Sequence, residues 1–358
     1  MHPASPGHVT MAQALEGRTK ALIELLRGRK RLLVLSHSNP DPDSLASAVA
    51  LRLLAAEGAD VPSTFGYSGR IMRAENREMV SACNIEMTPL SELDVSQYDC
   101  LALVDTQPGF GHTHLPEGRA IDIVVDHHLP PESPVDFPDA EFSDVRTHIG
   151  ATSSMVAGYL MEAGVEVPTD VATALVYGIR TDTADLARNA SPLDEEAYDY
   201  LLRRADRQAL SRITTPSLTH DYFTTLRQAL TNTRIYNEVV MCSLGKITAP
   251  EMVAEVADLL LRLEGNQTVF CGGLVGSTFY VSVRTELERD AYYLIRGAFD
   301  GMENCSYGGH GRIAGGSVTL PDDEERTLSR MERRLERNIL KTMGVDGVTV
   351  KCFGGARE

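Results

Sequence analysis

The chain has 358 residues, of which 43% are hydrophobic and 23% are charged, a composition typical of a globular protein. Its 50 acidic residues outnumber its 34 lysines and arginines, giving a formal net charge of −16. This charge argues against a surface that binds long duplex nucleic acid by neutralising phosphates, although a short anionic substrate in one local pocket remains compatible with it. No apolar stretch is long enough to span a bilayer, so we expect no membrane partner.

Sequence patterns over the first half of the chain predict an alternation of strands and helices. Short apolar runs predict buried strands at 31–36, 100–106 and 121–128. Helical patterns cover 21–28, 44–58, 151–164 and 170–182, with Ser44 predicted as the cap of the second helix. Strands that alternate with helices indicate a doubly wound, mostly parallel α/β sheet.

The second half of the chain predicts a smaller α/β domain. We place a first domain at 1–191, a polar helical connector at 192–235 and the second domain at 236–358. The strand pattern over 278–285 alternates apolar and polar residues, which predicts one buried face and one presented face that carries Arg284.

A glycine-rich stretch over 306–320 is interpreted as a loop that runs into a strand. The six cysteines form no C-x-x-C pair, so we expect neither a zinc site nor a disulfide framework. Reduced thiols are the ordinary state of such residues, and they favour a cytoplasmic location.

Acidic residues and histidines follow the predicted strands and close one predicted helix. They are His37, Asp41 and Asp43 after the first strand, Asp105 after the second, Asp126, His127 and His128 at the end of the third, and Asp182 at the end of the helix. Because parallel strands bring their carboxyl ends to one edge, these side chains can converge despite their separation in sequence. Carboxylates mixed with imidazole suit Mn²⁺, and also Mg²⁺ or Fe²⁺.

Each of these motifs also has a plain structural interpretation. The stretch NPDPD (39–43) is typical of a turn, Asp105 alone of a strand-end cap, and DHH (126–128) of a solvated loop. Their shared position at one sheet edge favours a metal site instead. So many carboxylates would repel one another without counter-charge, and two bridged dications would remove that repulsion.

The four motifs resemble, in order, those of the DHH family of phosphoesterases: HSNPDPDSLAS, LVDT, VVDHH and GIRTDT. The downstream stretches VSVRT and GGHGRIAGG resemble the DHH-associated C-terminal domain, so that the resemblance spans roughly residues 31–320. Two departures stand out. Ala46 takes the place of a common glycine, and Arg312 and Ile313 replace smaller residues.

The resemblance implies a role for each candidate residue. The metal ligands would be His37, Asp41, Asp43, Asp105, His127 and Asp182. Asp105 would bridge two Mn²⁺, Asp126 would orient a ligand or the attacking water, and His128 would contact the scissile phosphate or protonate the leaving oxygen. In the second domain a phosphate or nucleotide would be held by Arg284, Gly308, Gly309, His310 and Gly311.

We therefore expect a two-domain hydrolase with its active site in the cleft between the domains. Its substrates would be short oligonucleotides, dinucleotides or phosphorylated nucleotides, as in the nanoRNase and oligoribonuclease branch related to the RecJ exonucleases. The resemblance also suggests a homodimer. The alternatives are a pyrophosphatase or polyphosphatase with the same N-terminal motifs, and a non-catalytic nucleotide sensor. The Gly-Gly-His stretch argues against the first, and the complete ligand set argues against the second.

Overall fold

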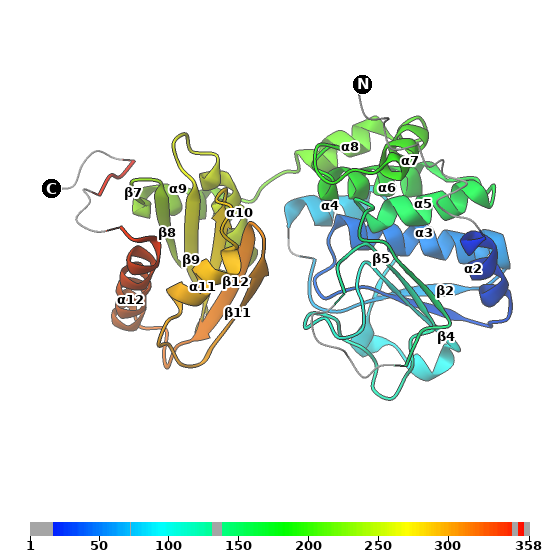
Figure 1. The fold of residues 1–358 in the computed structure, drawn as a ribbon, viewed down its shortest axis with the longest axis horizontal. Coiled ribbons are helices and arrows are strands. Elements are labelled where there is room, and N and C mark those ends of the chain that lie inside the picture. Colours follow the sequence, from blue (N-terminus) through cyan, green and yellow to red (C-terminus); the bar gives the residue numbers. More distant parts are fainter. Residues whose placement is uncertain (1–16, 72, 131–137, 346–349, 354–358) are drawn as a thin grey trace, which may run out of the picture. The chain divides into compact units, whose positions relative to one another are not determined.

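The computed structural model describes residues 17–71, 73–130, 138–345 and 350–353. Contacts within the chain divide it into two compact units, Met1–Pro216 and Ser217–Glu358 (Figure 1). Each unit has hydrophobic cores of its own. Across the described residues, no helix is both long and apolar enough to cross a membrane.

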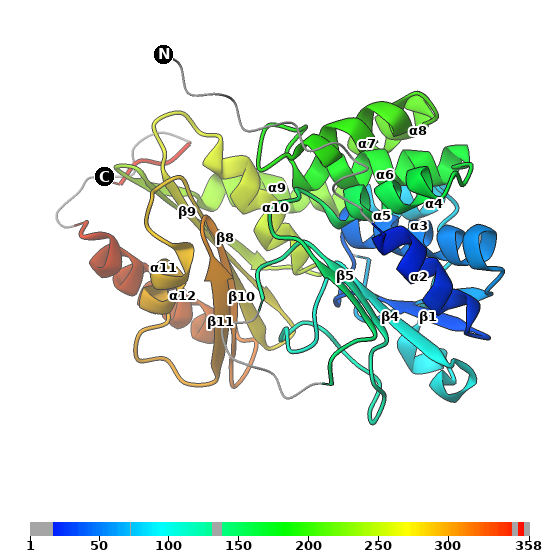
Figure 2. The same cartoon turned by 45° about the vertical axis from the view of Figure 1, so that its right-hand side comes forward.

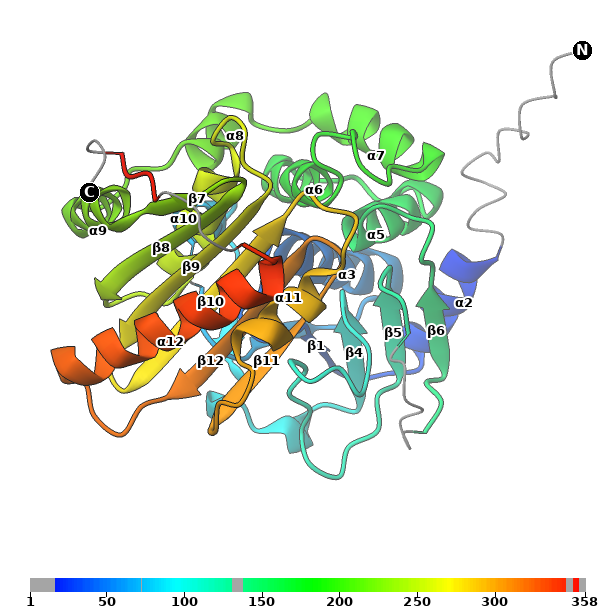
Figure 3. The same cartoon turned by 60° about the vertical axis from the view of Figure 1, so that its left-hand side comes forward.

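The first unit is built on a six-stranded sheet whose neighbouring strands are all parallel. The spatial order is β3-β2-β1-β4-β5-β6, and Figure 3 shows β1, β4, β5 and β6 side by side. The strands are β1 (Leu32–Leu35), β2 (Ser63–Tyr67), β3 (Thr88–Pro89), β4 (Cys100–Val104), β5 (Ile123–Asp126) and β6 (Phe142–Val145). The predicted parallel α/β fold is confirmed, and its three predicted strands correspond to β1, β4 and β5.

The strand order reverses between β1 and β4. β2 and β3 lie on one side of β1, and β4, β5 and β6 lie on the other. Such a reversal opens a crevice at the carboxyl ends of the two central strands, which is where open α/β sheets bind ligands. All four residues of β1 are buried, as expected for a parallel strand covered on both faces. Side chains that follow β1 and β4 therefore lie near one another at this edge of the sheet.

Two layers of helices cover one face of the sheet (Figure 1). α3 and α5 contact the strands, α6 packs across both of them, and α7 and α8 pack against α6. α2 lies beside α3 and α5 (Figure 2). The helices are α2 (Arg18–Arg27), α3 (Pro42–Ala59), α4 (Ala74–Ala82), α5 (Thr152–Glu162), α6 (Thr169–Asp182), α7 (Pro192–Leu202) and α8 (Arg207–Thr214). The four helices predicted before residue 183 correspond to α2, α3, α5 and α6.

The other face of the sheet carries a smaller core that contains Leu33, Leu101 and Val124. Short 3-10 turns over Leu90–Glu92 and Val95–Gln97 contribute partly buried side chains to this core. Two layers of helices therefore cover one face of the sheet, and a smaller core with short 3-10 turns covers the other.

Helix α3 begins two residues earlier than the sequence pattern predicts. Asp41 is its N-cap, because Oδ1 of Asp41 accepts the N–H of Ser44 at 3.0 Å, and Pro42 occupies the first helical turn. Ser44, predicted as the cap, lies inside the helix. The first turn of α3 thus carries both Asp41 and Asp43 at the carboxyl end of β1.

The segment 192–235, predicted as a separate connector, is divided between the two units. α7 and α8 have apolar sides that bury Leu201 and Ile213 in the core of the first unit. Helix α9 (His220–Asn232) buries Ala229 in a core of the second unit. The boundary between the units falls after Pro216.

The second unit is a six-stranded mixed sheet in the order β11-β12-β10-β9-β8-β7. Only β8 and β9 pair in parallel; the other neighbours are antiparallel. α9 and α10 cover one face, and α11 and α12 cover the other, as seen in Figure 3. The elements are β7 (Arg234–Tyr236), β8 (Val239–Lys246), α10 (Glu251–Leu261), β9 (Thr268–Val275), β10 (Thr278–Thr285), α11 (Ala291–Ala298), β11 (Cys305–His310), β12 (Ile313–Thr319) and α12 (Glu325–Met343). This confirms the predicted smaller second domain.

Candidate metal centre

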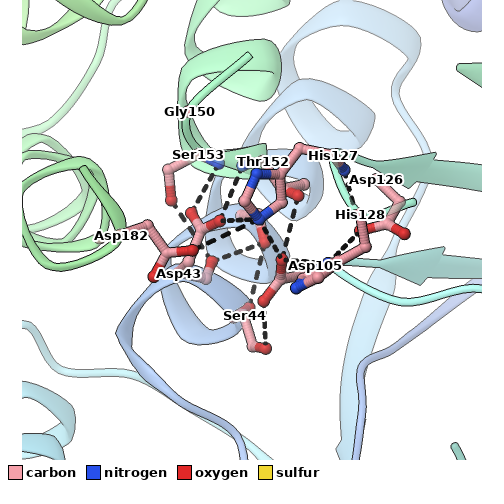
Figure 4. A network of polar contacts seen from close by, with 12 residues as sticks. Asp43, Ser44, Asp105, Asp126, His127, His128, Gly150, Thr152, Ser153 and Asp182 are labelled. Atoms are coloured by element: carbon pink, nitrogen blue, oxygen red, sulfur yellow. Dashed lines mark hydrogen bonds and ion pairs between the residues drawn. The ribbon is translucent and has the colours of Figure 1, made fainter. Parts of the chain in front are cut away.

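Asp105 is the carboxylate that links the parts of the predicted site. It follows β4 and has a left-handed backbone with φ of +58°, a strained conformation that is often found at functional sites. Its side chain is buried, and both oxygens accept hydrogen bonds from hydroxyl groups. Ser44 Oγ lies 2.8 Å from Oδ2, and Thr152 Oγ1 lies 3.1 Å from Oδ1 (Figure 4). The carboxylate is therefore fixed at the carboxyl edge of the sheet.

The two oxygens of Asp105 face two different groups of potential ligands. Oδ2 lies 3.6 Å from Nε2 of His37, which is also 3.7 Å from Oδ1 of Asp41. Oδ1 lies 3.6 Å from Nε2 of His127, which is 3.3 Å from Oδ2 of Asp182. One carboxylate thus stands between a group from the β1 loop and a group from β5 and α6.

Asp43 belongs to the second of these groups. It is fully buried, and its Oδ2 lies 3.9 Å from Nε2 of His127. Its two oxygens accept the backbone N–H groups of Thr152 and Ser153, each at 2.7 Å, at the start of α5. The positive end of the helix dipole favours a carboxylate at this point. The potential ligand atoms of Asp43, His127 and Asp182 all lie within 4.8 Å of one another. The same is true of those of His37, Asp41 and Asp105.

Asp126 orients the neighbouring histidine rather than joining either group. Its Oδ1 accepts hydrogen bonds from Nδ1 of His128 at 2.8 Å and from the backbone N–H of His127 at 2.9 Å. Its Oδ2 accepts a bond from Nε2 of Gln107 at 2.7 Å. Burial raises the pKa of Asp126, but the hydrogen bond and charge of His128, the hydrogen bond from Gln107 and the charge of His127 together outweigh burial, and the pKa is lowered. Asp126 therefore fixes the proton of His128 on Nδ1.

His37 and His127, two of the three histidines near Asp105, are strongly basic without a metal. Burial lowers the pKa of His37, but the nearby carboxylates of Asp105 and Asp41 outweigh this and raise it to about 11. Burial also lowers the pKa of His127, while the carboxylate of Asp182 contributes most to raising it to about 10. The two imidazoles therefore hold protons where a cation could otherwise bind.

The aspartates of the second group show the complementary effect. Burial and the charges of Asp105 and Asp182 raise the pKa of Asp43 well above its ordinary value. Burial and the charges of Asp41 and Asp105, opposed by the nearby imidazole of His127, raise the pKa of Asp182 to about 6. Without a cation, Asp43 and Asp182 thus have too little positive charge around them to ionise at their ordinary pKa.

Divalent cations fit this donor set. Nε2 of His127 is buried, and among the described residues it has no hydrogen-bond partner, although three carboxylates surround it. A cation bound there would take the place of the protons and supply the missing charge. Carboxylate oxygens with imidazole nitrogens suit Mn²⁺, Mg²⁺ or Fe²⁺. All six predicted ligands lie in this cluster.

Three residues that hold the site were missed by sequence reasoning. Ser44, Gln107 and Thr152 bind the carboxylates of Asp105 and Asp126. Ser44 and Gln107 lie close to the charged motifs, which was the available signal, whereas Thr152 lies 47 positions from Asp105, and a hydroxyl or amide carries no pattern of its own. Helix α5 has no side-chain cap, and the N–H groups of Thr152 and Ser153 at its start bind Asp43 instead.

Arg284 lies in the second unit and is buried, which corrects the prediction of a presented strand face. Helix α10 covers that face of β10, and only 7% of Arg284 is exposed. Its Nε donates to Asp258, and its Nη1 donates to Ser282 Oγ at 2.7 Å. The sequence pattern could not show that a helix returns over the polar side of the strand.

The glycine-rich stretch is a β-hairpin rather than a loop. Gly308 and Gly309 pair within β11, and Gly311 occupies the turn with φ of +54°. At Gly309, with φ of +154°, an added Cβ would lie 2.4 Å from the Cβ of Ala314, so only glycine fits. The side chain of His310 lies outside the described residues. The predicted substrate-binding residues belong to the second unit, whereas the six metal-ligand candidates belong to the first.

The parallel sheet and the aspartate–histidine cluster at its carboxyl edge define an α/β protein with a candidate divalent-metal centre. The chain belongs to the DHH family, since the model of the DHH family N-terminal domain matches residues 31–179. The uncharacterized protein MJ1633 of Methanocaldococcus jannaschii is 33% identical over 342 residues, which cover 92% of this chain and 68% of that protein.

Two further similarities cover most of the chain. The A-adding tRNA nucleotidyltransferase of Geobacter sulfurreducens is 26% identical over 320 residues, but these are 85% of this chain and only 34% of that enzyme. The crystal structure of an exopolyphosphatase-related protein from Bacteroides fragilis superposes with a TM-score of 0.69. It covers 92% of this chain and 98% of its own at 15% identity, and this similarity supports the two-domain fold.

Proposed function

We propose that the protein is a divalent-metal-dependent phosphodiesterase that hydrolyses short oligonucleotides, dinucleotides or phosphorylated nucleotides. The observation that carries the proposal is the position of Asp105, whose two oxygens face separate groups of ligand atoms. A carboxylate placed in this way suits a pair of cations roughly 3.5–4 Å apart, the arrangement found in phosphatases and nucleases.

One cation would be held by His37, Asp41 and Asp105. The other would be held by Asp43, Asp105, His127 and Asp182. We favour Mn²⁺, with Mg²⁺ or Fe²⁺ as substitutes, because the donors are hard oxygens mixed with imidazole. When bound, such a pair lowers the pKa of a water and binds the oxygens of a phosphoryl group.

The protein side chains would supply orientation and a proton. Ser44, Thr152 and the start of α5 hold the carboxylates in place. The arrangement of the proposed metal ligands would therefore exist before the substrate binds. Asp126 keeps the Nδ1 proton of His128 engaged at 2.8 Å, and Nε2 is then the nitrogen that would meet the scissile phosphate or the leaving oxygen.

We assign substrate binding to the second unit. Arg284 would pair with a phosphate, with Asp258 and Ser282 holding the guanidinium in place. The same substrate would also be bound by His310 and by the backbone of Gly308, Gly309 and Gly311. The net charge of −16 favours a short substrate over a long nucleic acid.

The test is hydrolysis by metal-stripped protein to which Mn²⁺ is returned. The panel contains a labelled RNA dinucleotide, a longer RNA, a cyclic dinucleotide, 3′-phosphoadenosine 5′-phosphate and pyrophosphate, and each is also given to Asp105→Ala. Cleavage of the short nucleotides, absent in the variant, supports the proposal. Turnover of pyrophosphate alone would move the assignment to a pyrophosphatase. Binding of nucleotides without any turnover would move it to a sensor.

A further inference from the structure

Five aromatic rings form a continuous series beside the metal centre. His127 and His128 lie 4.4 Å apart, measured between ring centroids, and His128 lies 6.2 Å from Phe110. Phe110 lies 5.5 Å from His112, which lies 5.4 Å from His37. The series therefore runs from a proposed ligand of one cation to a proposed ligand of the other. Phe110 and His112 are its third and fourth members, and neither belongs to the ligand groups described above.

The loop that carries these two rings is held in place at several points. The backbone N–H of Ser38 donates to the carbonyl oxygen of His112 at 2.8 Å, and Ser38 Oγ lies 2.6 Å from Nδ1 of His114. Within the loop, the N–H of Thr113 donates to the carbonyl oxygen of Phe110 at 2.9 Å. The loop after β4 is thus tied to the loop after β1, and its rings have a defined place.

The middle of the series is open to solvent, whereas the carboxylates beside it are not. His112 is exposed and Phe110 is half-buried, while Asp105 is only 1% exposed. Phe110 cannot ligate a cation or hydrogen-bond to a phosphate. A half-exposed phenyl ring at the edge of a charged site is suited to a planar group that stacks on it.

We infer that Phe110 and His112 form a stacking platform for the base of a nucleotide whose phosphate lies at the metal centre. This inference rests on the proposed function and narrows its substrate class. Stacking accepts any base, because every base has a π-face, so the platform would favour nucleotides over pyrophosphate without selecting a sequence. Recognition of the base would then begin in the first unit, next to the reacting phosphate.

The test compares equilibrium binding of adenosine 5′-monophosphate and of ribose 5-phosphate, which has the same phosphate and sugar but no base. Binding to the Mn²⁺-loaded full chain is measured by calorimetry and needs no turnover. Base stacking is worth a factor of about 5 to 150 in affinity. We expect the wild type to prefer the nucleotide by this factor. In Phe110→Leu and His112→Ala, the ratio of the two affinities should be near one.

Variants that keep a ring separate stacking from packing. Phe110→Trp and His112→Phe should retain the preference for the nucleotide, whereas Phe110→Leu keeps apolar volume and should lose it. Equal binding of the two ligands to the wild type, no binding of either, or an unchanged preference in Phe110→Leu and His112→Ala would overturn the inference. Phosphodiester hydrolysis without a base preference would leave the proposed function intact, and a base preference without hydrolysis would remove only the proposed catalysis.

Discussion

The hydroxyl of Ser44 lies 2.8 Å from Oδ2 of Asp105 and joins the first turn of α3 to the end of β4. This bond fixes the oxygen that faces His37, which is 3.6 Å away. A hydroxyl that orients a ligand carboxylate contributes to metal affinity without touching the metal.

Ser44→Ala should weaken Mn²⁺ binding by about 10-fold to 100-fold, because Asp105 loses one of its two hydroxyl donors. Titration calorimetry on chelator-treated protein measures this change. Ser47→Ala is the matched control, since Ser47 is also buried in α3 but donates to the backbone carbonyl of Asp43 instead of a ligand carboxylate. Equal affinities for the Ser44 and Ser47 variants would contradict the positioning role.

Asp105→Asn should remove the stabilisation that Mn²⁺ gives to the folded protein. A ligand that binds only the native state raises the free energy of unfolding by about 2.7 kcal/mol at a concentration 100 times its dissociation constant. We expect the melting temperature of the wild type to rise with Mn²⁺ and that of the variant to stay constant. Asp60→Asn is the control, because this exposed residue at the end of α3 has a φ of +58° that asparagine accepts. A normal rise in the Asp105 variant would count against its place in the site.

The convergence of the candidate ligands could be predicted from the sequence, because parallel strands deliver whatever follows them to a single edge. His37, Asp105 and His127 each follow an apolar run that is long enough to be recognised as a strand. The strands β2 and β6 were missed, since STFGY and FSDV are short and only partly apolar.

Contacts between distant segments could not be predicted in this way. The bond from Thr152 to Asp105 joins residues 47 positions apart, and no local pattern specifies it. The burial of Arg284 depends on α10, which packs over a strand that comes later in the chain. Sequence periodicity shows which side of an element is polar, but it does not show which other element covers that side.

Gly178→Ala should destabilise the first unit and disturb the site. A Cβ at Gly178 would lie 2.5 Å from Ser153 Oγ and 3.0 Å from the Cβ of Ala46, the alanine that replaces a common glycine. Overpacking of this kind costs about 1–3 kcal/mol, and thermal unfolding measures it. Gly28→Ala is the control, because its added Cβ would meet only Leu25 O, at 3.4 Å. Similar melting temperatures for both variants would show that the packing of α3, α5 and α6 tolerates the extra atom.

Asp126→Asn should lower kcat for dinucleotide hydrolysis by about 10-fold to 100-fold while Mn²⁺ still raises the melting temperature. The amide is a weaker acceptor for the Nδ1 proton of His128, and the ring would lose its fixed orientation. Gln107→Leu removes the donor to the other oxygen and to the carbonyl oxygen of His128 but keeps the bond to Nδ1, so it should have a smaller effect. An unchanged kcat in Asp126→Asn would contradict the role assigned to His128.

The central claim is that Asp105 joins two metal positions, and electron paramagnetic resonance of the Mn²⁺-loaded protein tests it most directly. The account predicts the exchange-coupled spectrum of two bridged Mn²⁺ ions in the wild type and its loss in Asp105→Ala. A spectrum of one isolated Mn²⁺ in the wild type, or a coupled spectrum that persists in the variant, would contradict it.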